Sequence, residues 1–263
     1  MQKPICCQIP SSHGSRILIE ITETKEWFGF KMEVARIGPS GENRVPCHIL
    51  WPNESDTPVP FVLATHGATS SKHEWTELDG YTKGGNLAQQ YLSAGIAVVA
   101  FDWHFHGDND TRELNGRNVF LPEHFDDFFD RSVLDANTVL HWARQNPSLD
   151  STRMAFSGYS LAGTFGFWLA NHGAGFKAMV LCVPGSGRQS DKYHSPCNNL
   201  GNLGKVSILQ VSAKQDEYIP TEEWNWLFNN APISDKTLFT YPSGHSLPLD
   251  YVQPAAEWLK ARL

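Results

Sequence analysis

A series of short, continuously apolar runs is the feature that most limits how this chain can fold. Polar, helix-like segments separate the six runs, which span residues 60–65, 95–101, 153–157, 177–183, 206–212 and 236–241. A strand that is apolar throughout is buried on both faces, as in parallel sheets that helices cover on each side. The pattern therefore predicts an α/β fold with a mostly parallel central sheet and helices on both of its faces.

The first 51 residues show a different pattern. Apolar and polar residues partly alternate over 16–21, 28–37 and 45–52, which predicts antiparallel strands and a sheet of about eight strands in all. Apolar residues three and four positions apart from Phe129 to Ala143 predict a helix before the third apolar run. No repeat or long linker interrupts the sequence, so residues 1–263 are predicted to form a single domain.

Composition excludes several classes of partner. A net charge of −7 gives nucleic acids and anionic membranes no electrostatic reason to bind. The N-terminus has no apolar leader, and no run approaches the roughly 18 apolar residues of a membrane span, so we expect a cytoplasmic protein.

The five cysteines are odd in number and form no C-x-x-C pair. This pattern predicts free thiols rather than disulfides or a thiolate zinc site.

A glycine-rich turn, GYSLAG (158–163), follows the third apolar run and precedes a segment with few helix breakers. The order strand, G-x-S-x-G turn and helix is typical of a nucleophilic serine, because the tight turn lifts the hydroxyl above the sheet edge. Ala162 stands where the motif usually has its last glycine, which weakens the match. On these six residues alone, a surface serine in a strand-to-helix turn is the competing interpretation of Ser160.

A serine hydroxyl becomes a nucleophile only when a base takes its proton and a third group holds that base. In this type of fold the acid and the histidine follow the serine, each just after a further strand. Asp216 follows the fifth apolar run and His245 follows the last. The sequence therefore predicts Ser160, Asp216 and His245 as a catalytic triad, and Glu217, which adjoins Asp216, stays open as the alternative acid.

Acyl transfer places negative charge on the carbonyl oxygen, and each preorganised N–H donor there contributes about 2.7–4 kcal/mol. One predicted donor is the amide of Leu161, which follows the serine at the start of a helix. The other comes from the loop after the first apolar run, where Ala68 is the first choice and Thr69 the alternative. His66 in this loop could be mistaken for a base, but we expect it to shape the loop by hydrogen bonding.

Six motifs over about residues 45–263 together carry a family resemblance: HGA (66–68), FDWHFHG (101–107), D-x-x-R (150–153), GYSLAG (158–163), QDEYIP (215–220) and SGHS (243–246). With them the sequence resembles the α/β-hydrolases, and within that superfamily it is similar to the dienelactone hydrolase and prolyl-oligopeptidase-like group. The resemblance implies a Ser160–His245–Asp216 triad with Ala68 and Leu161 as oxyanion donors. We expect no cofactor.

The stretch FDWHFHGDND (101–110) reads H-x-H-x-D, a spacing that can gather zinc ligands. A metallo-hydrolase of the H-x-H-x-D-H type would need a histidine where Asn109 stands, so we predict no metal site here. The resemblance instead matches Asp102 and His106 to a D-x-x-x-H-G pattern after the second core strand. We expect Asp102, His106 and Asp108 to hydrogen-bond neighbouring loops.

Three aromatic residues near predicted strand ends, Trp75, Trp103 and Phe105, are candidates for the wall of a substrate pocket. The insertion at 185–204 is long enough for a small lid but not for a cap domain. The sequence thus predicts a carboxylesterase with an open site for a small-molecule ester. Thioester, lactone or peptide hydrolysis on the same triad stays open, as does a ligand-binding protein without catalysis. The oligomeric state is not predicted.

Overall fold

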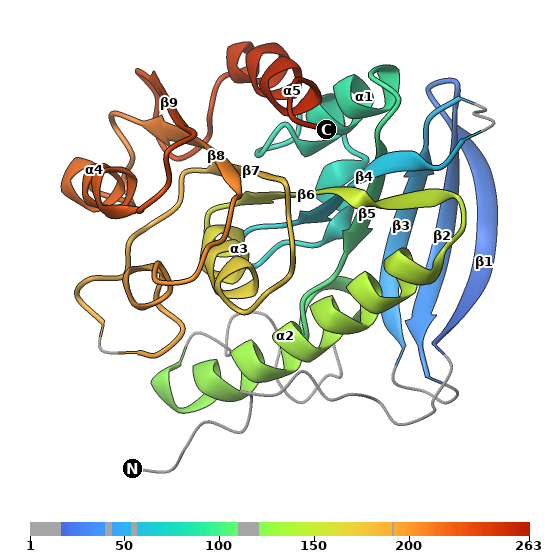
Figure 1. Ribbon diagram of the computed structural model, residues 1–263, viewed down its shortest axis with the longest axis horizontal. Helices are drawn as coiled ribbons and strands as arrows, with labels where there is room; N and C mark the ends of the chain where they lie inside the picture. Colours follow the sequence, from blue (N-terminus) through green and yellow to red (C-terminus); the bar gives the residue numbers. More distant parts are fainter. Residues whose placement is uncertain (1–16, 40–43, 54–56, 110–120, 191) are drawn as a thin grey trace.

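The described part of the chain forms one sheet of nine strands (Figure 1). The computed structural model describes residues 17–39, 44–53, 57–109, 121–190 and 192–263. The strands are β1 (Leu18–Trp27), β2 (Phe30–Gly38), β3 (Val45–Trp51), β4 (Val59–Thr65), β5 (Ala97–Phe101), β6 (Leu149–Tyr159), β7 (Ala178–Cys182), β8 (Ser207–Ala213) and β9 (Lys236–Tyr241). Their order is β1-β2-β3-β5-β4-β6-β7-β8-β9, and β4 to β9 are parallel. The predicted mostly parallel α/β sheet is confirmed, with nine strands where about eight were expected.

The antiparallel start of the sheet begins with a hairpin of β1 and β2, whose turn is Phe28 and Gly29. Both turn residues have positive φ, at 51° and 82°, which matches the right-handed twist of the strands. β1 continues to Trp27, beyond the predicted segment 16–21. Most of its side chains are exposed on both faces. Pairing with β2 therefore defines its second half, residues 22–27, where no apolar period marks a strand in the sequence.

Helices cover both faces of the sheet, as predicted (Figure 1). α1 (Gly84–Ser93) and α5 (Val252–Lys260) pack on one face, and α2 (Pro122–Gln145), α3 (Leu161–Asn171) and α4 (Thr221–Asn230) pack on the other. The predicted apolar face of α2 is buried: Phe129, Val133, Ala136, Leu140 and Ala143. None of the described helices combines the length and the apolar character that a bilayer crossing requires.

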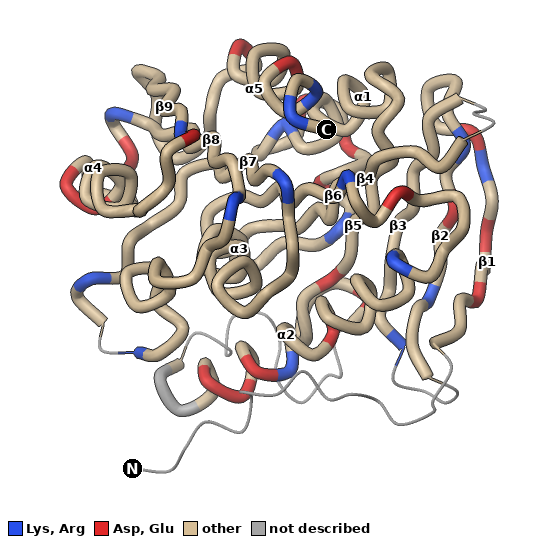
Figure 2. Tube along the Cα trace, viewed as in Figure 1, with Lys and Arg blue, Asp and Glu red and all other residues tan. Residues whose placement is uncertain are grey.

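The beginning of α2 is acidic, as the red segments at this end of the helix show in Figure 2. Two of these carboxylates hold the segment after β7: Asp126 accepts a hydrogen bond from Lys192 Nζ at 3.0 Å, and Asp130 accepts one from the Tyr193 hydroxyl at 2.5 Å. The predicted lid segment, 185–204, is therefore fastened to α2.

The cysteines that the structure describes, Cys47, Cys182 and Cys197, are free thiols, as predicted. Burial raises the pKa of the Cys182 thiol to about 12, so it behaves as a small apolar side chain. Cys6 and Cys7 lie outside the described residues.

Candidate active site

Ser160 stands in a strained turn between β6 and α3. Its φ of 53° and ψ of −111° are unusual for a residue with a side chain, and a hydrogen bond from its amide to Cys182 O at 2.8 Å supports this conformation. Two glycines make the close approach possible. A Cβ at Gly158 would lie 2.5 Å from the Ala162 Cβ, and one at Gly163 would lie 2.7 Å from the Pro184 Cβ. Ala162 is therefore accommodated because Gly158 faces it.

His245 follows β9 and binds Asp216, which follows β8. Its Nδ1 lies 2.8 Å from Asp216 Oδ2 and 3.0 Å from Oδ1. The same carboxylate accepts the amides of Tyr218 and Ile219, both at 2.9 Å, and is almost fully buried. Because a carboxylate with these donors is an acceptor, Nδ1 of His245 carries the proton and Nε2 keeps its lone pair.

Glu217 has a different role from Asp216. Its Oε2 accepts the backbone amide of His245 at 2.9 Å, and this hydrogen bond lowers the pKa of the Glu217 carboxyl. The contact needs a glycine before the histidine, since a Cβ at Gly244 would lie 2.7 Å from Glu217 Oε2. Of the two candidate acids, the structure therefore brings Asp216 to the imidazole and Glu217 to the backbone beside it.

Tyr159 holds the histidine loop from the opposite side. Its hydroxyl donates to His245 O at 2.5 Å and accepts the Leu247 amide at 2.9 Å. The ring of Tyr159 also meets the imidazole edge to face, with centroids 5.8 Å apart. The residue next to the candidate nucleophile thus fixes the backbone of the candidate base.

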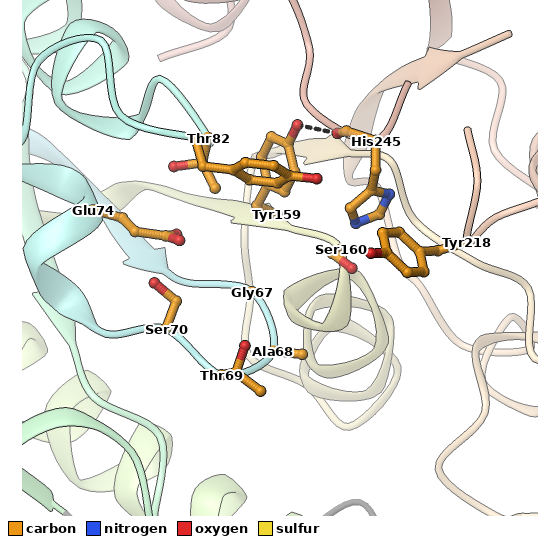
Figure 3. Close-up of a pocket in the computed structure, with 11 residues that line it drawn as sticks. Gly67, Ala68, Thr69, Ser70, Glu74, Thr82, Tyr159, Ser160, Tyr218 and His245 are labelled. Atoms are coloured by element: carbon orange, nitrogen blue, oxygen red, sulfur yellow. Dashed lines mark hydrogen bonds between the residues drawn. The ribbon is translucent and has the colours of Figure 1, made fainter. Parts of the chain in front are cut away.

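Ser160 and His245 line one cavity of about 650 Å³. Figure 3 shows the imidazole of His245 turned toward the Ser160 hydroxyl at the edge of this cavity. We call it the Glu74 cavity, and its wall is formed by Gly67, Ala68, Thr69, Ser70, Glu74, Tyr81, Thr82, Tyr159, Ser160, Tyr218 and His245. Ser160, His245 and Asp216, from three loops at the carboxyl edge of the sheet, therefore come together at one place.

His66 orients the loop that carries Ala68. Its Nε2 accepts the Trp103 amide at 3.2 Å and its Nδ1 donates to Gly67 O at 2.8 Å, which defines one neutral tautomer. Burial lowers the pKa of His66 to about 3, so the ring stays neutral. In a trans peptide the N–H points opposite to the C=O, so a Gly67 carbonyl held by His66 turns the Ala68 N–H away from that ring. His66 shapes the loop, as the sequence predicts.

Leu161, the second predicted donor residue, is the first residue of α3. The first amides of a helix have no partner within the helix, so the Leu161 N–H, which follows Ser160, is left without one inside α3. Thr69, the alternative donor residue, has a φ of 60° and also lines the Glu74 cavity.

A buried ion pair anchors the same loop to the stretch 101–109. Lys72 Nζ donates to Asp102 Oδ2 at 2.8 Å and to Asp108 Oδ2 at 2.7 Å, and the Lys72 amide donates to Asp102 Oδ1 at 2.7 Å. His106 Nδ1 lies 3.0 Å from His104 O. The predicted structural role of Asp102 and Asp108 is confirmed. Within the described residues, no three His, Cys, Asp or Glu side chains are grouped to hold a metal ion.

Solved structures share this architecture at low sequence identity. An esterase from an Arctic intertidal metagenomic library matches with a TM-score of 0.71 and 17% identity, covering 92% of this chain and 98% of that one. Acetyl xylan esterase 1 from Thermoanaerobacterium sp. JW/SL YS485 matches with a TM-score of 0.72 and 17% identity, covering 94% and 88%. A glucuronoyl esterase from Solibacter usitatus matches with a TM-score of 0.69 and 11% identity, covering 95% and 87%. The chain has the α/β-hydrolase fold. No protein-family model and no curated protein matches the sequence.

A second cavity of this α/β-hydrolase fold meets the first at Ser160. It measures about 520 Å³ and shares Ala68 and Ser160 with the Glu74 cavity. We call it the Phe125 cavity, and its other wall residues are Phe125, Leu161, Thr164, Gly185, Gly187, Ser190, Lys192, His194, Ser195, Pro196 and Ile219. More than half of these come from the predicted lid segment or α3. The serine thus lies between two spaces, and His245 borders only the first.

The three aromatic residues predicted to contact substrate lie in the interior and line neither of these cavities. Trp103 is fully buried, stacks on Phe165 with centroids 3.9 Å apart and donates its indole N–H to His66 O at 3.1 Å. Phe105 and Trp75 are 5% and 4% exposed. A large apolar ring gains more from core packing than from an open cavity, so these side chains support the site from behind.

Sequence reasoning missed the residues that do line the Glu74 cavity, above all Glu74 and three tyrosines. Tyr159 directly precedes the predicted nucleophile and Tyr218 lies two positions after the predicted acid, and this proximity was an available signal. Glu74 and Tyr81 lie in a polar segment without periodicity, where position in the fold alone reveals their role.

Proposed function

We propose that this protein is a serine hydrolase that cleaves a carboxylic ester through an acyl-enzyme intermediate. The observation that carries the proposal is the meeting of Ser160 and His245 in one cavity, with His245 Nδ1 bound to Asp216 Oδ2 at 2.8 Å. A strained serine, an imidazole with a free Nε2 lone pair and a buried carboxylate are the parts that nucleophilic acyl transfer needs.

In the proposed reaction, Ser160 Oγ forms a bond to the carbonyl carbon while its proton moves to Nε2 of His245. Asp216 holds the ring and stabilises the imidazolium. The ester C–O bond then breaks, and His245 gives the proton to the departing alcohol oxygen. A water molecule, deprotonated by His245, attacks the acyl-enzyme, and breakage of the bond to Ser160 Oγ releases the acid and restores the hydroxyl.

The amides of Ala68 and Leu161 are the proposed oxyanion donors. Both residues flank Ser160 in the Phe125 cavity, and each amide would contribute about 2.7–4 kcal/mol to the transition state. The geometry of His66 supports this assignment, because its hydrogen bond to Gly67 O directs the Ala68 N–H away from the ring.

The two cavities suggest how an ester would lie. The leaving oxygen must reach His245, which borders only the Glu74 cavity, so we assign this cavity to the alcohol and the Phe125 cavity to the acyl group. Several structural neighbours are named as esterases, including an acetyl xylan esterase and a glucuronoyl esterase, which favours an oxygen ester over a thioester or a peptide.

A fluorophosphonate probe tests the proposal, because it phosphonylates only an activated serine. Covalent labelling of the wild type that is absent in Ser160→Ala, together with hydrolysis of p-nitrophenyl acetate by the wild type only, is the expected result. A folded wild-type protein that is neither labelled nor active would instead favour a ligand-binding protein. Loss of activity in chelator, with Ser160→Ala still active, would point to a metal enzyme.

A further inference from the structure

Glu74 occupies the wall of the Glu74 cavity without a part in the proposed mechanism. Figure 3 shows its carboxylate pointing into the cavity from the wall opposite His245. The hydroxyls of Ser70 and Thr82 and the backbone of Gly67 lie near it and favour its ionised form. Burial nevertheless raises the pKa of this carboxyl above its ordinary value, since these contacts do not replace water completely.

Among the described residues, no cation balances this carboxylate. In the part of the chain that the structure describes, Glu74 forms no ion pair, and the charged residue that acts on it is another acid, Glu77. The wall of the cavity contains no lysine or arginine. Because buried charges in proteins are normally paired, a carboxylate that faces a substrate cavity without a partner needs an explanation.

The other side-chain polar groups of the wall are hydroxyls and the His245 imidazole. The Tyr159 hydroxyl is already bound to His245 O and to the Leu247 amide. Apart from that of Ser160, the remaining hydroxyls come from Thr69, Ser70, Tyr81, Thr82 and Tyr218, and neutral groups of this kind do not balance a carboxylate. What sets this wall apart is one negative charge beside aromatic rings.

Three tyrosine rings stand around this space. The Tyr218 ring lies 5.1 Å from the His245 ring, and the Tyr81 ring lies 6.5 Å from the rings of both Tyr159 and His245. Tyr218 and Tyr81 are 69% and 52% exposed, so their faces are available to a ligand. Aromatic faces attract cations and gain nothing from anions.

We propose that the Glu74 cavity selects esters whose alcohol part carries a positively charged ammonium group. Glu74 supplies the counter-charge, and the faces of Tyr81 and Tyr218 shield the cation from water. This inference rests on the proposed function, because the ester alcohol is assigned to this cavity through His245. It makes Glu74 a specificity-determining residue and excludes anionic alcohols.

An isosteric pair of substrates isolates the charge. The acetate ester of choline and 3,3-dimethylbutyl acetate have the same shape, and only the quaternary nitrogen differs from carbon. We expect kcat/KM to be roughly tenfold or more higher for the choline ester, from charge pairing together with cation–π contacts. An acetate ester of 3-hydroxypropanoate, which is anionic, should be the poorest substrate. Equal or reversed preference within the isosteric pair overturns the proposal.

Glu74→Gln should reduce the choline preference to near one, because the amide keeps the hydrogen-bond acceptor but loses the charge. Glu77→Gln is the matched control: it removes the same charge from an exposed position outside the cavity wall, so the preference should stay within about twofold. A preference that survives in Glu74→Gln would refute the role of this carboxylate. If that variant does not fold, Tyr218→Leu should lower the preference roughly two- to fivefold.

The two proposals fail in different ways. A wild type that is labelled by fluorophosphonate and cleaves both esters equally retains the serine mechanism but loses the cation site. If no probe or ester reacts, the serine mechanism fails, and calorimetric titration with choline decides the cation site without catalysis. Binding that Glu74→Gln abolishes supports the cation site, and the absence of binding to the wild type overturns it.

Discussion

The buried ion pair beneath the site offers a test of the structure that does not depend on activity. Lys72 and Asp102 have fully buried side chains, and Lys72→Met removes the ammonium while leaving the carboxylate in place. Removing one partner of a buried ion pair typically lowers the free energy of unfolding by about 3–5 kcal/mol. Asp102 keeps the amides of Lys72 and Asp108 at 2.7 and 2.9 Å, so we expect the lower end, about 3 kcal/mol.

Denaturant unfolding of the variant and the wild type measures this difference, read from the shift in midpoint at constant m-value. In a thermal scan the same loss should lower Tm by about 6 °C for a chain of this size. Lys25→Met is the matched control, because Lys25 binds Glu23 at 3.2 Å with both side chains about half exposed. It should change the free energy of unfolding by less than about 1 kcal/mol.

A free energy of unfolding for Lys72→Met within about 1 kcal/mol of the wild type would refute the reasoning, because the pair would then behave like a surface pair. The double variant Lys72→Met/Asp102→Asn adds a second check. Removing the unpaired charge should recover part of the loss, so the double variant should be more stable than Lys72→Met alone.

The remaining predictions concern the residues around the imidazole and in the Glu74 cavity. Asp216→Asn should lower kcat on the order of 10⁴-fold in an ester assay, and Glu217→Gln less than tenfold, since only Asp216 holds the His245 ring. Tyr159→Phe should cost about 1–3 kcal/mol in denaturant unfolding, because the Leu247 amide loses its acceptor, and should lower kcat more than it raises KM. Burial raises the pKa of Glu74, so its ionised form destabilises the folded state. Glu74→Gln should therefore raise Tm at pH 8. Calorimetry should show this gain disappear as the pH falls through the raised pKa toward the ordinary value of 4.5.

The core strands and the order of the candidate site residues could be predicted because their signals are local. Burial on both faces leaves an unbroken apolar run, and each such run after residue 59 became a strand near its predicted place. A strained turn also limits the size of the side chains beside it, as the close approach of Gly158 to Ala162 shows. Loops at the carboxyl ends of parallel strands share one edge, so the convergence of Ser160, Asp216 and His245 followed from strand order.

Contacts between distant loops left no such signal. Lys72 lies in a polar segment and resembles a surface lysine, yet Asp102, thirty positions later, holds it in the interior. Trp103 was expected in a pocket because it follows a strand. Its ring instead turns into the core, where it stacks on Phe165. The sequence indicates which residues are apolar or charged, and the tertiary packing decides on which side of a loop they lie.

One short segment connects stability, catalysis and the proposed selectivity. Lys72 and Glu74 are two residues apart in the 3-10 turn Lys72–Trp75, and at three residues per turn their side chains point in different directions. Lys72 points inward to Asp102, and Glu74 points into the cavity, while Ala68 precedes both in the same loop. A Lys72 substitution that loosens this turn should therefore reduce kcat and the preference for a cationic ester together, whereas Glu74→Gln should change the preference and leave the ion pair intact.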